Sequence, residues 1–266
     1  MITLVLLRKE LKSLFSSWMA YIVLITFTLL AGIVFYATLD IFEAAVRWAS
    51  SVAEGESRAT WNLDDQLIVP LYKTIFMLLF MMVPAITMRL FAEEKKQRTN
   101  ELLLTSPVRI IEIVLAKYLA AAALITLMLL PVAIFPALII AYSDGAPDWG
   151  PMVTGYGALF LLAYALAAIG IFASSLTENQ IVAYIFALAL EMLFFLVAQA
   201  SMTMDVIKIG GVVLNLGALL RNLSLEDHFE SLLAGLVKLD DLVYFGTLIV
   251  FWLWATGKSV ESARWA

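Results

Sequence analysis

The chain has 266 residues, and 63% of them are hydrophobic, whereas a soluble globular domain has about 45–50%. Only 15% are charged, and the mean hydropathy is +0.94. Lipid must therefore solvate much of the chain, which excludes a soluble enzyme, a disordered protein and a nucleic-acid binder. The net charge of −5 also argues against a phosphate-backbone partner. Because there is no cysteine and only one histidine, His228, thiol chemistry is excluded and a histidine-based metal site or triad is disfavoured.

Six stretches are long and apolar enough to form membrane-spanning helices, each of which needs about 20 apolar residues. They occupy residues 18–39, 68–90, 114–141, 152–173, 181–202 and 241–256. The last stretch is short, so thinning of the bilayer or a neighbouring segment has to complete its crossing. The sequence thus predicts an all-α, polytopic membrane protein with one transmembrane domain over residues 1–266.

Lysine and arginine are distributed unevenly between the two sides of these spans. With the N-terminus inside, the inner segments hold 11 of the 17 cations and seven acids, for a net charge of +4. The outer segments hold six cations and 14 acids, for a net charge of −8. Because cytoplasmic loops carry the excess of positive charge, both termini are predicted to be cytoplasmic. The first apolar run is too long for a cleaved signal peptide, and no matching cleavage site follows it.

Residues 1–17 precede the first span and have an amphipathic pattern. Five apolar residues follow the helical period, and Arg8, Lys9 and Lys12 take the opposite face. The pattern predicts a helix over 3–15 that lies in the membrane interface with its cations toward anionic headgroups. A cytoplasmic extension of the first span is the alternative.

Two segments are predicted to lie on the outer side. The loop 40–67 is acidic, and its paired Asp64 and Asp65 are interpreted as part of a solvated loop rather than a metal site. Segment 205–240 is rich in Leu, Val and Gly, and Ser224 and Asp227 have the spacing of a capping box. The apolar stripe that follows predicts a short helix that dips into the outer leaflet or packs on the bundle; it comprises Phe229, Leu232, Leu233, Leu236 and Val237.

Segment 89–113 is the most charged part of the chain. Charges of both signs precede the apolar triplet Leu102–Leu103–Leu104, and Pro107 then breaks the helix. A charge run is usually a solvated face, but an apolar patch ringed by both charges also suits the docking of a soluble partner. Composition alone leaves these two readings open. We expect five residues of this loop to be exposed and to contact little else in the chain: Glu93, Glu94, Lys96, Glu101 and Leu103.

The chain contains no motif that nominates catalytic residues. Gly257-Lys258-Ser259 resembles the end of a phosphate-binding loop, but Trp252 stands where that loop requires glycine. In the predicted fifth span, Glu191 lies near mid-membrane, where an ionisable residue indicates either function or a hydrogen-bonded structural role. Gln199 is close to the same face, so both are candidates for a translocation path or a permease interface.

Small residues in the predicted fourth span occur at spacings that suit close helix packing. They are Gly155, Gly157, Ala163, Ala167, Gly170 and Ala173.

The string FAEEKKQRTNELLLTSP at 91–107 resembles a signature of ABC-2-type transporter permeases between their second and third spans. GIFASSLTENQIVAY at 170–184 and LSLEDHFESLLAGLVKLDDLVYF at 223–245 are similar to two further stretches of that family. The subgroup it most resembles serves gliding-motility-associated and nitrous-oxide-reductase-maturation ABC systems. The sequence departs from the family at Arg98, where glycine usually precedes the threonine, and at Leu225 and Ala234, where proline and arginine are common.

The resemblance implies a six-span permease with an N-terminal elbow helix, outer re-entrant helices and a coupling segment at 91–108. That segment would dock on a cytoplasmic ATPase subunit, present in two copies, that binds ATP and Mg. The residues implied for this interface are Glu93, Glu94, Lys96, Arg98, Glu101, Leu102 and Leu103. Two permeases would pair, with transport directed outward across the bacterial inner membrane, and a periplasmic partner could be attached. The spans hold few polar groups, which favours a lipidic or amphipathic cargo.

Two other functions remain as alternatives. One is a membrane anchor or force-transmitting scaffold of an ABC-type complex that transports nothing. The other is an intramembrane enzyme.

Overall fold

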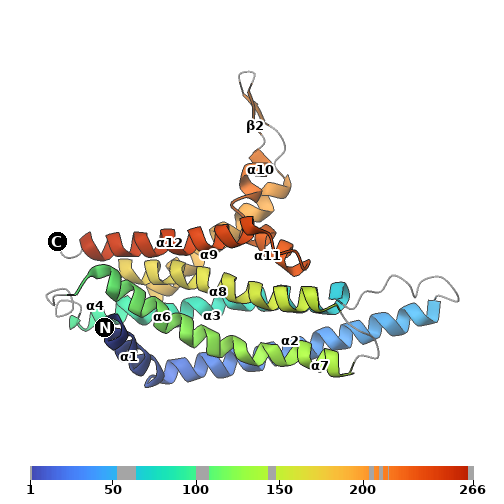
Figure 1. The fold of residues 1–266 in the computed structure, drawn as a ribbon, viewed down its shortest axis with the longest axis horizontal. Helices are drawn as coiled ribbons and strands as arrows, with labels where there is room; N and C mark the ends of the chain where they lie inside the picture. The colour runs from blue at the N-terminus through green and yellow to red at the C-terminus, as the bar shows by residue number, and fades with distance from the viewer. Residues whose placement is uncertain are drawn as a thin grey trace.

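The computed structural model describes residues 2–52, 64–99, 108–142, 148–203, 207–209, 212–214 and 216–262. Within these ranges the chain is a helical bundle with both termini at one end (Figure 1). Its helices are α1 (Ile2–Phe15), α2 (Trp18–Val52), α3 (Val69–Thr87), α4 (Arg89–Lys96), α6 (Ile110–Leu129), α7 (Ile134–Tyr142), α8 (Trp149–Leu176), α9 (Gln180–Thr203), α10 (Leu216–Arg221), α11 (Leu225–Leu233) and α12 (Leu239–Ser262). One π turn, Asp64–Ile68, precedes α3, and a 3-10 turn, Leu130–Ala133, joins α6 to α7.

The predicted all-helical, six-span architecture is confirmed. Six helical stretches are long and apolar enough to cross a membrane. They cover Trp18–Trp48, Gln66–Lys96, Ile110–Tyr142, Trp149–Leu176, Gln180–Ala200 and Leu239–Ser262. The last helix is longer than the predicted span 241–256: its 24 residues reach about 36 Å at 1.5 Å per residue.

Helix α8 forms the centre of the bundle. The buried share of its most apolar window is 72%, against 17% for α2 and 22% for α9. It packs against α3, α6, α9, α11 and α12. Two of its small residues explain this close packing, because a Cβ atom at Gly155 would lie 2.6 Å from the Tyr72 ring, and one at Gly170 would lie 2.1 Å from Thr87 Oγ1. Gly157 has open space beside it and makes no such contact.

At the end of the bundle opposite the termini, α11 packs under the start of α12 (Figure 1). The predicted N-cap is confirmed, because the Ser224 side chain accepts a hydrogen bond from the Asp227 N–H at 3.1 Å. Gly235, with a φ of +79°, ends the helix in the left-handed conformation that glycine adopts without strain. The apolar stripe therefore stops earlier than predicted, and Leu236 and Val237 lie beyond the helix and are exposed.

Two features of this end were not predicted. The strands β1 (Ile207–Ile209) and β2 (Val212–Leu214) form an antiparallel hairpin in which Lys208 pairs with Val213. The hairpin and α10 project away from the bundle (Figure 1). Helix α2, with 35 residues, extends beyond the other spans on this side.

Candidate functional site

The junction between α3 and α4 is held by a serine from the central helix. Ser174 Oγ accepts hydrogen bonds from the backbone N–H groups of Phe91 and Ala92, each at 3.1 Å, and donates to the Met88 carbonyl at 2.8 Å. Phe91, Ala92 and Ser174 are all buried. The side chain thus satisfies backbone groups at the point where one helix ends and the next begins.

Two further contacts fix α4 to α8. Gly170, one turn before Ser174, lets Thr87 pack directly against the α8 backbone. Lys95 Nζ donates to the Ser175 carbonyl at 2.5 Å. Helix α4 is therefore attached to the centre of the bundle at the end where the termini lie.

Helix α4 ends in a left-handed turn at Arg98. The φ of this residue is +56°, and its N–H donates to the Lys95 carbonyl at 3.0 Å. This is the position after a helix where glycine is preferred, because a Cβ atom strains the left-handed conformation. Arg98 thus keeps the turn geometry that the usual glycine would have.

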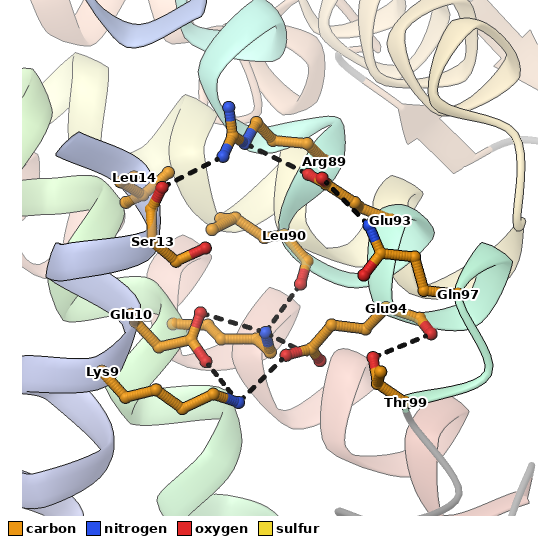
Figure 2. A pocket seen from close by; sticks show the side chains of 11 residues that line it. Lys9, Glu10, Ser13, Leu14, Arg89, Leu90, Glu93, Glu94, Gln97 and Thr99 are labelled. Carbon is orange, nitrogen blue, oxygen red and sulfur yellow. Dashed lines mark hydrogen bonds and ion pairs between the residues drawn. The ribbon is translucent and has the colours of Figure 1, made fainter. Parts of the chain in front are cut away.

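A cluster of four charged residues joins α1, α4 and α6 (Figure 2). At its centre, the buried Lys117 of α6 places Nζ 2.9 Å from Glu94 Oε2 and 3.2 Å from Glu10 Oε2. It also donates to the Leu90 carbonyl at 2.7 Å. Lys9 lies 3.5 Å from Glu94 and 3.7 Å from Glu10. Two lysines and two glutamates therefore balance in charge; we call them the Lys117 cluster.

A cavity of about 230 Å³ lies beside the Lys117 cluster, between α1 and α4 (Figure 2). Arg89 borders it, with Nε 3.5 Å from Glu93 Oε2, one guanidinium nitrogen bonded to the Ser17 hydroxyl and the other 3.4 Å from the Ser13 carbonyl. These polar contacts link the start of α4 to the turn between α1 and α2.

A helix, α1, precedes the first span, and most of the predicted apolar face turns inward, although Leu4 is exposed; its position in the membrane interface stays a prediction. Leu14 is buried and Leu11 packs against the core, whereas Arg8 and Lys12 are exposed. The inward face also contains Glu10, which is only 6% exposed and pairs with Lys117. Helix α1 packs along α6.

The expectation that the predicted interface residues contact little else in the chain is wrong for Glu93 and Glu94. Glu94 has ion pairs with Lys9 and Lys117, and Glu93 has one with Arg89. Both carboxylates point back toward cations on α1, α4 and α6, because the buried Lys117 and the half-buried Arg89 require partners.

The other predicted interface residues divide into two groups. Lys96 and Arg98 are exposed at the tip of α4. Glu101, Leu102 and Leu103 fall outside the described residues.

The structure separates Glu191 from Gln199. Glu191 is completely buried within the bundle, and neither carboxyl oxygen has a hydrogen-bond partner among the described residues. Gln199 is exposed and bonds to Glu226 of α11. Their assignment to a translocation path or a permease interface stays a prediction.

Polar contacts also hold α11 in place. Lys73 of α3 pairs with Glu230, and His228 Nδ1 lies 2.6 Å from Asp241 Oδ1 at the start of α12. The His228 ring stacks on Tyr244 with a centroid distance of 4.0 Å. Lys73 therefore has an ion-pair partner within the chain.

Sequence reasoning missed the Lys117 cluster, although two signals were present. Position 10 falls between Leu7 and Leu14 on the apolar face of α1, where a glutamate is out of place without a partner. Lys117 interrupts the apolar run of α6 in the same way. The pairing itself depends on the tertiary contact between α1 and α6.

The comparisons with known proteins agree with this architecture. The family model described as ABC-2 family transporter protein matches residues 4–258. No curated protein matches the chain. Because the family model covers almost the whole chain and the fold has six spanning helices, this protein belongs to the ABC-2 family of transporter proteins, as a multi-pass membrane component.

Proposed function

We propose that this chain is the permease subunit of an ATP-driven ABC exporter in the bacterial inner membrane. A cytoplasmic ATPase subunit, in two copies, binds ATP and Mg and docks on the coupling segment. Two permeases pair, and ATP hydrolysis moves a substrate outward between them. A periplasmic partner can be attached to this assembly.

The attachment of α4 is the observation that carries the proposal. This short helix is fixed to α8 through Ser174 and to α1 and α6 through the Lys117 cluster. Its tip, with Lys96 and Arg98 exposed, leads directly into residues 100–107. A partner that moves this segment would therefore act on the bundle itself rather than on a loose loop.

The distribution of charge supports the proposed orientation. The termini, the tip of α4 and the α8–α9 connection lie at one end of the bundle, as the Ser175–Ser259 and Lys95–Ser175 hydrogen bonds indicate. This is the end with the excess of lysine and arginine, so we place it in the cytoplasm.

The proposed cargo is lipidic or amphipathic. Exposed faces of α2, α9 and α12 are apolar, with Ile33, Leu193 and Val250 each more than half exposed. Such faces are suited to contact lipid or a second permease. They provide no polar groups that could line a path for a bulky hydrophilic solute.

Binding of the ATPase subunit to the reconstituted permease tests the proposal. We expect Leu103→Ala combined with Glu101→Lys to leave the spans folded and to weaken binding by about tenfold to thousandfold, the usual range for an interface leucine and a charge pair. Glu94 is left unchanged in this variant because it pairs with Lys117. Leu236→Ala, at an exposed residue of the opposite end, is the matched control. Unchanged binding by the double variant would contradict docking at this segment.

A second measurement separates the exporter from a non-transporting scaffold. In proteoliposomes, an exporter moves labelled lipid or an amphipathic substrate only with ATP. A scaffold binds the ATPase equally well but moves nothing.

A further inference from the structure

The Lys117 cluster surrounds a buried ammonium group with two carboxylates and a backbone carbonyl. Lys117 is 1% exposed; its Nζ donates hydrogen bonds to Glu10 Oε2 and to the Leu90 carbonyl, and it forms an ion pair at 2.9 Å with Glu94 Oε2. Its Nζ also lies 5.1 Å from the centroid of the Phe91 ring. Separating the ion pairs of this buried ammonium group would be costly, because its charge is shielded from solvent and depends on the two carboxylates.

The two carboxylates come from different helices. Glu10 belongs to α1 and Glu94 to α4, and Lys9 of α1 bridges them a second time. Beyond the cluster, Arg89 of α4 donates a hydrogen bond to the Ser13 carbonyl of α1, and a cavity of about 230 Å³ separates much of the two helices (Figure 2). Ion pairs of the Lys117 cluster, supported by Arg89, therefore make most of the polar connection between these two helices.

Helix α4 forms the first part of the coupling segment, and α6 begins directly after the segment ends. Helix α1 continues after a short turn into α2. A displacement that begins in the coupling segment can thus reach α2 through α1 only if α4 and α1 move together.

We propose that the Lys117 cluster is the positioning element that makes α1, α4 and α6 one rigid body, so that an ATPase-driven displacement of α4 is carried to α1. Lys117, Glu10, Glu94 and Lys9 act through helix positions and touch neither ATP nor substrate. This inference rests on the proposed function.

Distances between spin labels test it on the full chain, whose lack of cysteine allows labels at chosen sites. One pair joins Lys12 of α1 to Gln97 beside α4, and the other joins Lys12 to Ser262 of α12; all three side chains are exposed. The reconstituted permease–ATPase complex is measured without nucleotide and with a non-hydrolysable ATP analogue. We expect the Lys12–Gln97 distance to stay constant and the Lys12–Ser262 distance to change.

The matched variant is Glu10→Gln, Glu94→Gln and Lys117→Met together, which removes the buried charges without leaving one unpaired. We expect it to bind the ATPase with a Kd within about twofold of wild type. In the triple variant, the ATP analogue should change the Lys12–Gln97 distance. It should change the Lys12–Ser262 distance by less than half of the wild-type change. Lys117→Arg with native carboxylates should keep most of the wild-type movement, because it retains the charge.

Several results would overturn the inference. One is a Lys12–Gln97 distance that changes in the wild-type complex on addition of the analogue. This result is decisive even if the triple variant fails to fold, because it needs only the wild-type protein. Wild-type movement of Lys12–Ser262 in the triple variant is another, as is the absence of any movement in a wild-type complex that binds ATPase. Loss of ATPase binding in a folded triple variant would make the cluster part of the docking surface instead. A wild-type permease that binds no ATPase contradicts the proposed function itself.

Discussion

Arg98 occupies a backbone conformation that suits glycine better. Substitutions at this position can therefore distinguish the effect of the arginine side chain from the effect of the left-handed backbone. The left-handed conformation costs an L-residue about 1–2 kcal/mol, and the Arg98 side chain is exposed. We expect Arg98→Gly to keep or raise Tm, whereas Arg98→Val should lower stability by about 1 kcal/mol or more because a β-branched residue resists this conformation. Thermal unfolding in nanodiscs measures both. A Tm that falls equally in the two variants would show that the guanidinium itself stabilises the fold.

Glu191 is the second residue whose side chain can be tested alone. Both carboxyl oxygens are buried and unpartnered within the described part of the chain, an arrangement that costs about 1–3 kcal/mol for a polar group. We therefore expect Glu191→Leu to insert normally and to unfold at a higher temperature than wild type. Met192→Leu, at an exposed site of the same helix, is the control and should change Tm little. A marked loss of stability in Glu191→Leu would mean that the carboxyl has a stabilising partner.

At the scale of elements, Ser174 stabilises the junction between α3 and α4. Ser174→Ala leaves two buried backbone N–H groups without their acceptor, so we expect a loss of about 2–3 kcal/mol in the free energy of unfolding. Ser16→Ala is the matched control, because its hydroxyl bonds only the exposed Ser13 carbonyl and should change stability by less than about 0.5 kcal/mol. Chemical unfolding followed by tryptophan fluorescence gives both values, and equal losses would contradict the role assigned to Ser174.

Helix α11 should respond to pH through Glu226. Burial raises the pKa of this carboxyl, and Glu230 adds to the rise while Lys73 opposes it. A carboxyl whose pKa is higher in the folded state stabilises the fold at low pH, and this contribution is lost as the pH rises above about 4.3, the usual unfolded value. Glu226→Gln should therefore raise Tm at pH 7 and have little effect near pH 4. Asp240→Asn, at an exposed position, should lack this pattern, and a Glu226→Gln Tm that is unchanged at pH 7 would refute the assignment.

The elements that the sequence predicted well are those that one chain segment specifies by itself. The six apolar runs, the amphipathic pattern of α1 and the Ser224 cap all depend on residues within about one helix of each other. Contacts between distant segments escaped prediction. Glu94 was expected to be free for a partner, but Lys117 lies 23 residues away in sequence and reaches it only after α4 and α6 pack. The length of α12 was underestimated because Lys258 and Ser259 continue the helix beyond the apolar run.

At the scale of the whole molecule, the bundle has two ends with different attachments. At the terminal end, ion pairs and Ser174 fix α4 to α1, α6 and α8. At the other end, Lys73 and Asp241 fix α11 to α3 and α12. Between the two ends, α8 is largely buried and packs against most of the other helices. A displacement of α4 would therefore act on a closely packed helix. This arrangement is consistent with the proposed docking of an ATPase at this end, because a force applied to α4 would be passed to the rest of the bundle.

Site-specific photocrosslinking tests the docking site most directly. A photoreactive amino acid at Leu103 of the full-length permease is illuminated in the reconstituted complex, and the same group at Tyr142 is the control because that exposed residue belongs to the opposite end. The account predicts a covalent adduct with the ATPase subunit from position 103 and none from position 142. No adduct from position 103 in a complex that hydrolyses ATP, or equal adducts from both positions, would contradict docking on the coupling segment.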